Sequence, residues 1–313
     1  MAHIPVMLDE CLKYLNIKSD GIYIDGTLGG GSHSEAILKQ LSTGFLYGFD
    51  QDIEAIERTK KKLAPYKENF VVIKENFEFM KENLEKRNVI SVDGILLDLG
   101  VSSFHFDDES RGFTYRKDAP LDMRMDLSNE LDAKTLLNTY SEKAIRRILF
   151  EYGEEKFAPN IARNIIRYRE KSPLETTHQL VDIIRDSIPK KVLAKKGHPA
   201  KKTFQALRIA VNDELGVLKR TLKKALSMLN PDGRLCVITF HSLEDRIVKR
   251  AFKDAATVDH PKEIPTMPTT SPDYELLHRK VIIPSSQELA ENNRSHSAKL
   301  RAIKKVNKNN ENQ

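Results

Sequence analysis

The chain has 313 residues, of which 40% are hydrophobic and 31% charged, and its formal net charge is +6. This length can bury the core of one large domain or of two smaller ones. It contains no apolar run of 18 residues, so no transmembrane helix is predicted, and the N-terminal stretch MAHIPVMLDECLKYL lacks the pattern of a secretion signal. We therefore expect a soluble cytoplasmic protein.

The chain has only two cysteines, Cys11 and Cys236, and neither belongs to a C-x-x-C pair. We therefore expect neither a disulfide nor a cysteine zinc site, which agrees with a reducing compartment. Each cysteine is predicted to be a small buried apolar residue. No metal site is predicted.

The positive charge is concentrated in two segments. Residues 108–202 hold 20 Lys and Arg against 15 Asp and Glu, and residues 294–313 hold 6 against 1, so each segment carries +5. The rest of the chain therefore carries −4. Two interpretations stay open, a solvated helical surface with a frayed tail, or two segments that face a polyanion.

The first hundred residues alternate between strand and helix patterns. The predicted strands are 21–26, 45–50, 69–76 and 92–100, and the predicted helices are 33–41, 52–64 and 80–85. Such alternation is typical of a parallel sheet with helices on both faces. The apolar run before Asp98 fits a strand that is buried on both sides.

The next hundred residues read as helices and polar loops. Helices are predicted at 144–153, at 157–171 and at 177–188, the last with Thr177 as a possible N-cap. The pattern of an α/β domain then returns, with a long helix at 204–230, strands at 234–240, 275–283 and 298–306, and a helix at 242–255 opened by Ser242. We therefore predict a discontinuous sheet domain, 1–107 and 203–313, with a helical insertion at 108–202.

A glycine-rich stretch, DGTLGGGSHS, lies between the first predicted strand and the first predicted helix. A sharp turn explains the glycines about as well as a bound ligand does. Asp50, however, ends the second strand 20 residues after Gly30, where an acid can accept hydrogen bonds from ribose hydroxyls. Together these features favour a nucleoside-type ligand at this end of the sheet.

The stretch does not match the dinucleotide fingerprint G-x-G-x-x-G. It resembles the first motif of S-adenosylmethionine-dependent methyltransferases, D-x-G-x-G-x-G, with Thr27 in place of the first glycine. A dinucleotide brings a pyrophosphate that suits a bare helix N-terminus. S-adenosylmethionine carries an ammonium and a sulfonium instead, so carboxylates at the strand ends suit it.

Several longer motifs occur in a fixed order along the chain: HIPVML, DGTLGGGSHS, LLDLGVSS, RGFTY, PLDMRMD, TFQALRIAVNDEL, GRLCVITFHSLEDRIVK and RSHSAKLRA. Over nearly the whole length the chain resembles the bacterial family that methylates N4 of a cytosine in 16S ribosomal RNA. This resemblance implies a class I (Rossmann-like) α/β methyltransferase domain with an inserted all-helical domain, and S-adenosyl-L-methionine as cofactor. Ser32 stands where the family usually has glycine, a change expected to alter cofactor affinity without abolishing binding.

The resemblance implies a set of cofactor-binding residues: Gly31, Ser32, His33, Asp50, Phe77, Asp98 and His105. The turn at 31–33 would reach the methionine portion, Asp50 the ribose and Phe77 the adenine ring. Each position also has a structural alternative. These are a helix N-cap for Asp50, plain core for Phe77, a cap of the following turn for Asp98, and an exposed or structural histidine for His105.

Transfer to N4 needs alignment and an acceptor for the amine hydrogens, because the lone pair of that nitrogen is delocalised into the ring. Many amino-methyltransferases use a D/N-P-P-Y/F motif after the fourth strand, whereas this chain has only its acid, in Asp98-Leu99-Gly100-Val101. Asp98 or a neighbouring carbonyl is our candidate acceptor. His241, after the fifth strand, is a candidate for positioning the base, with Ser242 as its neighbour or as a helix cap.

The substrate must present an unpaired cytosine. Basic stretches in the insertion (189–202) and in the tail (294–305) can contact phosphates, so the expected partner is 16S ribosomal RNA or the small ribosomal subunit, and not a membrane. Three alternatives stay open. They are a non-catalytic RNA-binding assembly factor, a nicotinamide-dependent oxidoreductase and a small-molecule methyltransferase.

Overall fold

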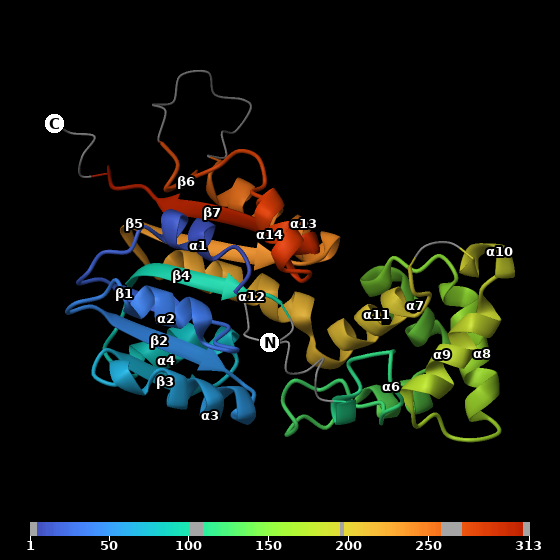
Figure 1. Ribbon diagram of the computed structural model, residues 1–313. Helices are drawn as coiled ribbons and strands as arrows, with labels where there is room; N and C mark the ends of the chain where they lie inside the picture. The colour runs from blue at the N-terminus through green and yellow to red at the C-terminus, as the bar shows by residue number, and fades with distance from the viewer. Residues whose placement is uncertain (1–4, 101–108, 195–196, 258–270, 309–313) are drawn as a thin grey trace, which may run out of the picture. The chain divides into compact units, whose positions relative to one another are not determined.

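The computed structural model describes residues 5–100, 109–194, 197–257 and 271–308. The chain forms two compact units, one from Met1–Gly100 with Gly216–Gln313 and the other from Val101–Leu215 (Figure 1). Within the described ranges, no helix has the length and apolar character needed to cross a membrane.

The first unit is built on a seven-stranded sheet in the order β3-β2-β1-β4-β5-β7-β6. Its strands are β1 (Ile22–Asp25), β2 (Phe45–Asp50), β3 (Phe70–Lys74), β4 (Val92–Asp98), β5 (Leu229–Thr239), β6 (Tyr274–Leu276) and β7 (Lys299–Lys305). Strands β1 to β5 pair in parallel, whereas β7 is antiparallel to both β5 and β6. The sheet is therefore mixed, and its strand order changes direction between β1 and β4.

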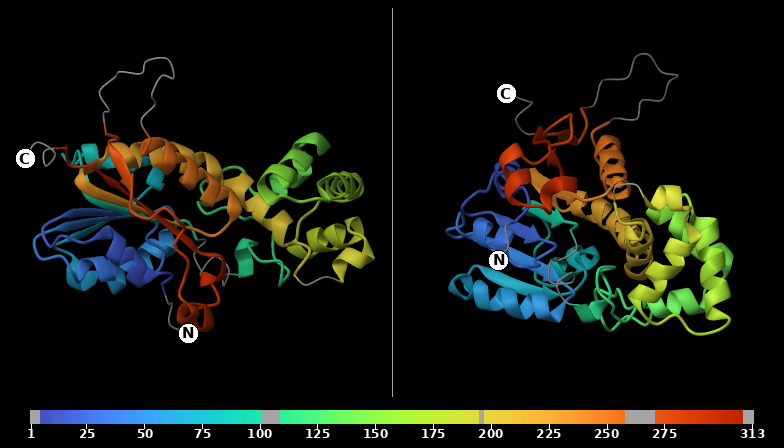
Figure 2. Two further views of the ribbon diagram at one scale, coloured as in Figure 1. Left: turned by 90° about the horizontal axis from the view of Figure 1, so that it is seen from above. Right: turned by 45° about the vertical axis from the view of Figure 1, so that its right-hand side comes forward.

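Side chains alternate between the two faces of this sheet, as the pleat requires. On one face Ile95 and Val237 pack with the helices α4 (Met80–Glu85), α12 (Glu214–Ser227) and α13 (Ser242–Ala255). On the other, their chain neighbours Leu96 and Cys236 pack with α1 (Leu8–Leu15) and α2 (Ser32–Leu38). Figure 2 shows these two helical layers on opposite sides of the sheet. The remaining helices of the unit are α3 (Ile53–Lys62) and α14 (Ser286–Glu291).

The second unit is helical. It contains α6 (Ala133–Thr139), α7 (Glu142–Gly153), α8 (Ala158–Arg169), α9 (Thr177–Ser187), α10 (Lys190–Leu193) and α11 (Lys201–Asn212). Apolar residues at helical spacing on α7, α8, α9 and α11 form a core of their own, separate from the two cores of the sheet unit. Its members include Ile145, Leu149, Ile161, Ile184 and Leu207.

The second half of the chain corrects three predictions. The predicted helix 204–230 is two helices, because Asp213 adopts a left-handed conformation (φ 47°) between α11 and α12. The strand predicted at 275–283 covers only Tyr274–Leu276, with an isolated bridge from Ile282 to Leu300. The predicted insertion 108–202 ends too early, because α11 contributes Phe204, Leu207 and Val211 to the helical core.

Two predicted helix caps are each displaced by one residue. Thr176, not Thr177, caps α9 and forms a capping box with Gln179. His241, not Ser242, caps α13, and its partner in the capping box is Glu244. In both cases the polar residue just before the predicted cap has extended backbone geometry, which the N-cap position requires.

Candidate functional site

Three acids lie at the carboxyl ends of parallel strands, and two of them, Asp50 and Asp98, were predicted as site residues. Asp25 ends β1, Asp50 ends β2 and Asp98 ends β4. Because β1 and β4 are neighbours at the point where the strand order reverses, these ends border the crevice in which open α/β sheets bind ligands.

The glycine-rich loop after β1 is tied to both neighbouring strands. The N–H of Gly26 donates to the Leu96 carbonyl on β4 (2.9 Å), and the N–H of Leu28 donates to the Phe49 carbonyl on β2 (2.9 Å). The N–H of Gly29 donates to Oδ2 of Asp50 (2.9 Å). The loop is therefore held across the sheet end rather than looping out into solvent.

Two of its glycines are required by conformation or by close packing. Gly31 has φ +68°, and a Cβ there would lie 2.6 Å from Cγ2 of Thr59. At Gly26 a Cβ would lie 2.4 Å from Cδ2 of Leu97 and 3.2 Å from Cβ of Phe77. The turn geometry alone therefore accounts for these glycines, whether or not a ligand is bound.

Both carboxylate oxygens of Asp25 accept hydrogen bonds from the protein itself. Its side chain is 1% exposed, and its Oδ2 accepts a 2.6 Å hydrogen bond from the Ser34 hydroxyl while Oδ1 accepts from the N–H of Thr27. Burial raises the pKa of this carboxyl, and the Ser34 hydrogen bond and the His33 ring oppose that rise. Asp25 therefore locks the loop onto the first turn of α2.

Asp50 faces the glycine loop from the end of β2. Besides the bond from Gly29 to Oδ2, its Oδ1 accepts from the N–H of Asp52 (2.9 Å). The cap of α3 is Asp52, whose Oδ1 accepts from the N–H of Glu54. Asp50 is thus not the N-cap that the sequence offered as an alternative. Both carboxylate oxygens of Asp50 thus accept backbone hydrogen bonds, one from the glycine loop and one from the N-cap residue of α3.

Asp98 and His33 meet at the end of β4. Oδ2 of Asp98 lies 3.9 Å from Nδ1 of His33, and Oδ1 accepts from the N–H of Gly100 (3.1 Å). Nε2 of His33 is 3.0 Å from the Val6 carbonyl, which can only accept, so this nitrogen carries the hydrogen. The Nδ1 atom therefore faces Asp98, and the ring orientation is set by the N-terminal segment.

Asp98 is the more accessible of the two acids beside the crevice, because its side chain is 22% exposed whereas Asp25 is buried. Burial raises the pKa of the Asp98 carboxyl, and the His33 ring and the Gly100 N–H oppose that rise. The carboxylates of Asp25 and Glu244 push the pKa further up. A carboxylate with a raised pKa is a better proton acceptor than an ordinary one.

Phe77 lies beside the same loop. It opens a short 3-10 helix, Phe77–Phe79, directly after β3, and its partly buried ring packs against one of the sheet cores. The close approach to Gly26 places the Cβ of Phe77 next to the end of β1. The prediction that Phe77 stacks on adenine stays a prediction, as does the role of His105, which lies outside the described residues.

Ser32 is accommodated by a lysine from α3. Nζ of Lys62 donates to Oγ of Ser32 (2.9 Å) and to the Gly30 carbonyl (3.3 Å), and it also pairs with Glu35 (3.2 Å). The Ser32 hydroxyl, at the position where the resembled motif has glycine, thus has a hydrogen-bond donor of its own. Lys62 was not predicted, because no local pattern links it to a residue 30 positions earlier.

His241 lies at the end of β5, beside the Asp98 region. The N–H of Glu244 donates to its Nδ1 (3.4 Å), and its Nε2 lies 3.0 Å from Oε1 of Glu244 but outside hydrogen-bond geometry. Oε2 of Glu244 accepts from the N–H groups of Phe240 and His241. Both ring nitrogens therefore face Glu244, an arrangement that serves the helix cap, and contact with a base stays a prediction.

The two cysteines are buried and carry free thiols, as predicted. Burial raises the pKa of the Cys236 thiol to about 12, and it also raises that of Cys11. Neither thiol can supply a thiolate nucleophile at neutral pH.

Comparison with known proteins identifies the family of the chain. A family model described as the MraW methylase family matches residues 1–306. Among solved structures, the chain is 13% identical to a Clostridium thermocellum protein provisionally described as an rRNA methylase, covering 97% of this chain and 100% of that one (TM-score 0.45). An rRNA methylase from Streptococcus thermophilus is also 13% identical, with coverage of 98% and 100% (TM-score 0.42).

A third structure, from Streptococcus mutans, is provisionally described as a methyltransferase in complex with SAH. It is 12% identical, with coverage of 98% and 100% (TM-score 0.43). All three TM-scores are below 0.5, so the family assignment rests on the family model alone. Because that model spans almost the whole chain, the protein belongs to the MraW methylase family.

Proposed function

We propose that this protein transfers a methyl group from S-adenosylmethionine to the exocyclic N4 of a specific cytosine in 16S ribosomal RNA. That it is an S-adenosylmethionine-dependent methyltransferase follows from its family. The base, the N4 position and the ribosomal RNA substrate belong to the proposal.

The observation that carries the proposal is the bonding of the glycine loop. Five N–H groups between residues 26 and 31 donate within the protein, those of Gly26, Thr27, Leu28, Gly29 and Gly31. A pyrophosphate cradle needs such groups aimed at the ligand. Carboxylates line this sheet end as well, which disfavours a dinucleotide and suits a cofactor with positive charges.

The residues present fit S-adenosylmethionine, whose sulfonium supplies an electrophilic methyl group with a neutral leaving group. Asp50, held by Gly29 and Asp52, is the residue for the ribose hydroxyls. The turn at 31–33 is the region for the methionine portion, and Phe77 is the aromatic residue for the adenine.

Asp98 is the candidate acceptor for the N4 hydrogens. Its carboxylate is partly exposed at the end of β4, where the strand order reverses. Its raised pKa makes it a stronger base than an ordinary aspartate. Two hydrogen bonds fix its position. The N–H of Gly100 donates to Oδ1 of Asp98, and the backbone N–H of Asp98 donates to the hydroxyl of Thr27. Holding the amine hydrogens there rehybridises the nitrogen toward a tetrahedral nucleophile, and the remaining catalysis is alignment.

An RNA substrate agrees with the charge of the chain. Residues 108–202, most of the helical unit, carry 20 Lys and Arg against 15 Asp and Glu. Phosphate contacts from such a surface supply affinity, while selection of one cytosine requires contacts to the unpaired base.

The test has two steps. Calorimetry with S-adenosylmethionine and with NAD⁺ should give binding heat only for the first, and Asp50→Ala should remove it. Bare 16S RNA and assembled small subunits are then incubated with methyl-labelled cofactor, and the digested nucleosides are separated by mass spectrometry. Label on N4 of cytidine in one of these substrates supports the proposal, whereas label on another atom, or RNA binding without transfer, would overturn it.

A further inference from the structure

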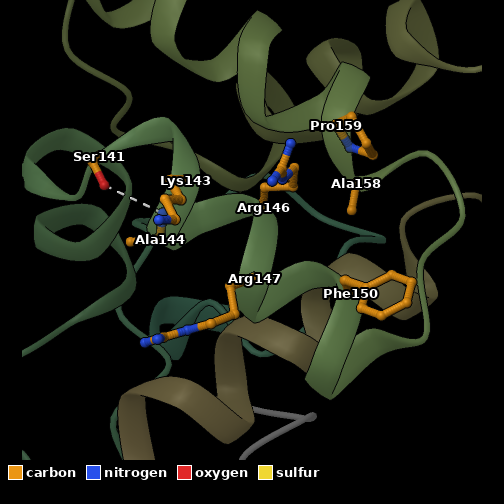
Figure 3. Close-up of a pocket in the computed structure, with 8 residues that line it drawn as sticks. All are labelled: Ser141, Lys143, Ala144, Arg146, Arg147, Phe150, Ala158 and Pro159. Atoms are coloured by element: carbon orange, nitrogen blue, oxygen red, sulfur yellow. Dashed lines mark hydrogen bonds between the residues drawn. The ribbon is translucent and has the colours of Figure 1, made fainter.

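A hollow of about 440 Å³ lies on the helical unit, between the first turns of α7 and α8 and the outer side of α7 (Figure 3). This volume is within the roughly 300–1,000 Å³ of ligand-sized pockets. Three cationic side chains and an aromatic ring line it, together with the start of α8: Lys143, Arg146, Arg147, Phe150, Ala158 and Pro159.

The lining residues of α7 form one stripe. Positions 143, 146, 147 and 150 have the i, i+3, i+4, i+7 spacing that places side chains on one helix face. The opposite face, with Ile145, Ile148 and Leu149, is buried in the helical core. The stripe is therefore the solvent side of α7, yet it carries Phe150 with 66% of its surface exposed.

The cations of the stripe have no ion-pair partner among the described residues. In the part of the chain that the structure describes, Lys143, Arg146 and Arg147 form no ion pair, although Glu142 and Glu151 lie on the same helix. The first turn of α8, which borders the hollow, contains no acidic residue, although just before it the carboxylate of Glu155 accepts from the N–H of Phe157 (2.9 Å). The charged side chains that line the hollow are therefore all cations.

Figure 3 shows Phe150 and Ala158 toward one side of the hollow and Lys143 and Ala144 toward the other, with Arg146 between them. Exposed apolar rings that stand among unpaired cations are typical of surfaces for single-stranded nucleic acid, where bases stack and phosphates are neutralised. A duplex offers phosphates but no free base face. An acidic protein surface would use the cations without requiring the ring.

We propose that this stripe, Lys143, Arg146, Arg147 and Phe150, is a binding site for an unpaired segment of the substrate RNA, with one base stacked on Phe150 and adjacent phosphates on the arginines. The site rests on the proposed function, since it deepens the recognition of RNA. It is a binding site and takes no part in methyl transfer.

The chain contains no Trp, which provides a direct readout. In Phe150→Trp the single indole reports on stacking, and its fluorescence should be quenched by an unstructured oligouridylate. A blunt-ended RNA duplex and a polyphosphate chain should leave the fluorescence unchanged. Quenching by polyphosphate as well, or none by the oligouridylate while it binds, would overturn the stacking contact.

Alanine variants separate the two contributions. Phe150→Ala should weaken oligouridylate binding about tenfold or more, with the salt dependence unchanged. Arg146→Ala and Arg147→Ala should each lower the slope of log K against log salt by about 0.7, the contribution of one single-strand phosphate contact. Thermal unfolding of each variant verifies that it remains folded.

Matched controls lie on the same unit. Leu127→Ala removes another exposed apolar side chain (54% exposed), and Lys171→Ala removes an exposed cation two residues beyond the end of α8. Lys171 follows the C-terminal end of α8, whereas Pro159 lies in its first turn. Both controls should bind oligouridylate as the unaltered protein does, and an equal loss in them would overturn the site.

Methyl transfer to 16S RNA by the unaltered protein is measured in parallel. If transfer occurs but the stripe variants bind and methylate RNA normally, the stripe is wrong and the proposed function stands. If no transfer occurs but RNA binding depends on Phe150 and the arginines, the stripe stands and the proposed function is wrong.

Discussion

The hydroxyl of Thr27 accepts a 2.7 Å hydrogen bond from the backbone N–H of Asp98, across 71 positions of the chain. This bond joins the glycine loop after β1 to the end of β4, where the candidate acceptor lies. Thr27 stands where the methyltransferase motif usually has glycine, so its side chain has a specific structural role that the motif does not indicate.

Replacing Thr27 should weaken the link between the glycine loop and the end of β4. Thr27→Val keeps the shape but leaves the Asp98 N–H without its acceptor, which should cost about 1–3 kcal/mol of unfolding free energy and weaken cofactor binding. Thr27→Ser keeps the hydroxyl and should stay close to the unaltered protein in both. Urea denaturation and cofactor calorimetry measure the two effects, and equal behaviour of the two variants would contradict the assignment.

Two glycines of the loop should respond differently to alanine. Gly29 (φ +48°) has room for a Cβ, whose nearest atom would be 3.8 Å away, so Gly29→Ala should cost only the strain of about 1–2 kcal/mol. Gly31→Ala adds a clash with Thr59 and should cost more. Thr59→Ser removes the methyl in question and should partly rescue Gly31→Ala, but not Gly29→Ala, in denaturation experiments.

Asp98→Asn should separate binding from chemistry. If the carboxylate accepts the amine hydrogens, turnover at saturating cofactor should fall about 100-fold or more, with cofactor affinity changed much less. Activity of the unaltered protein should fall as pH decreases through a pKa above the ordinary 3.8, because burial raises the pKa of Asp98 and the ionised form is the acceptor. Near-native turnover of Asp98→Ala at saturating cofactor would refute the role.

Asp25 should make stability depend on pH. Its carboxyl has a pKa raised by burial, so the folded state retains the proton at a pH where the unfolded chain has lost it. Unfolding then releases a proton, and the unfolding free energy decreases as pH rises from about 3.9 through the raised value. Asp25→Asn removes this dependence. Urea denaturation across that range should therefore show that the unfolding free energy of the unaltered protein falls relative to that of Asp25→Asn as pH rises.

Ser32 and Lys62 should be coupled. Ser32→Gly, which restores the residue usual in the family, and Lys62→Ala should each remove the 2.9 Å bond between them. A double-mutant cycle in urea should give a coupling of about 0.5–1 kcal/mol, because Lys62 is partly exposed. Lys61→Ala, on the same helix, should show no coupling to Ser32→Gly.

Much of the fold was readable from local patterns. The apolar run 95–97 and the alternation of strand and helix predicted β1 to β4 and the helices between them, since periodicity and turn residues are local signals. The break at Asp213 was not readable, because the apolar periodicity continues through it and only a left-handed backbone separates α11 from α12. The two N-caps were each predicted one residue too late for a related reason. Several polar residues in a row can each serve as the N-cap, and the backbone conformation decides which of them does.

The sequence alone determined the strand and helix order from β1 to β4, the acids at the ends of the strands and the family resemblance, because each depends on residues close together in the chain. Only the tertiary structure decided what those acids do. It buried Asp25 against Ser34, placed Asp50 on the Gly29 N–H, and set Asp98 between His33 and Gly100. Burial and partners distant in sequence determine whether a carboxylate holds a loop or is available to a ligand, and neither can be read from spacing.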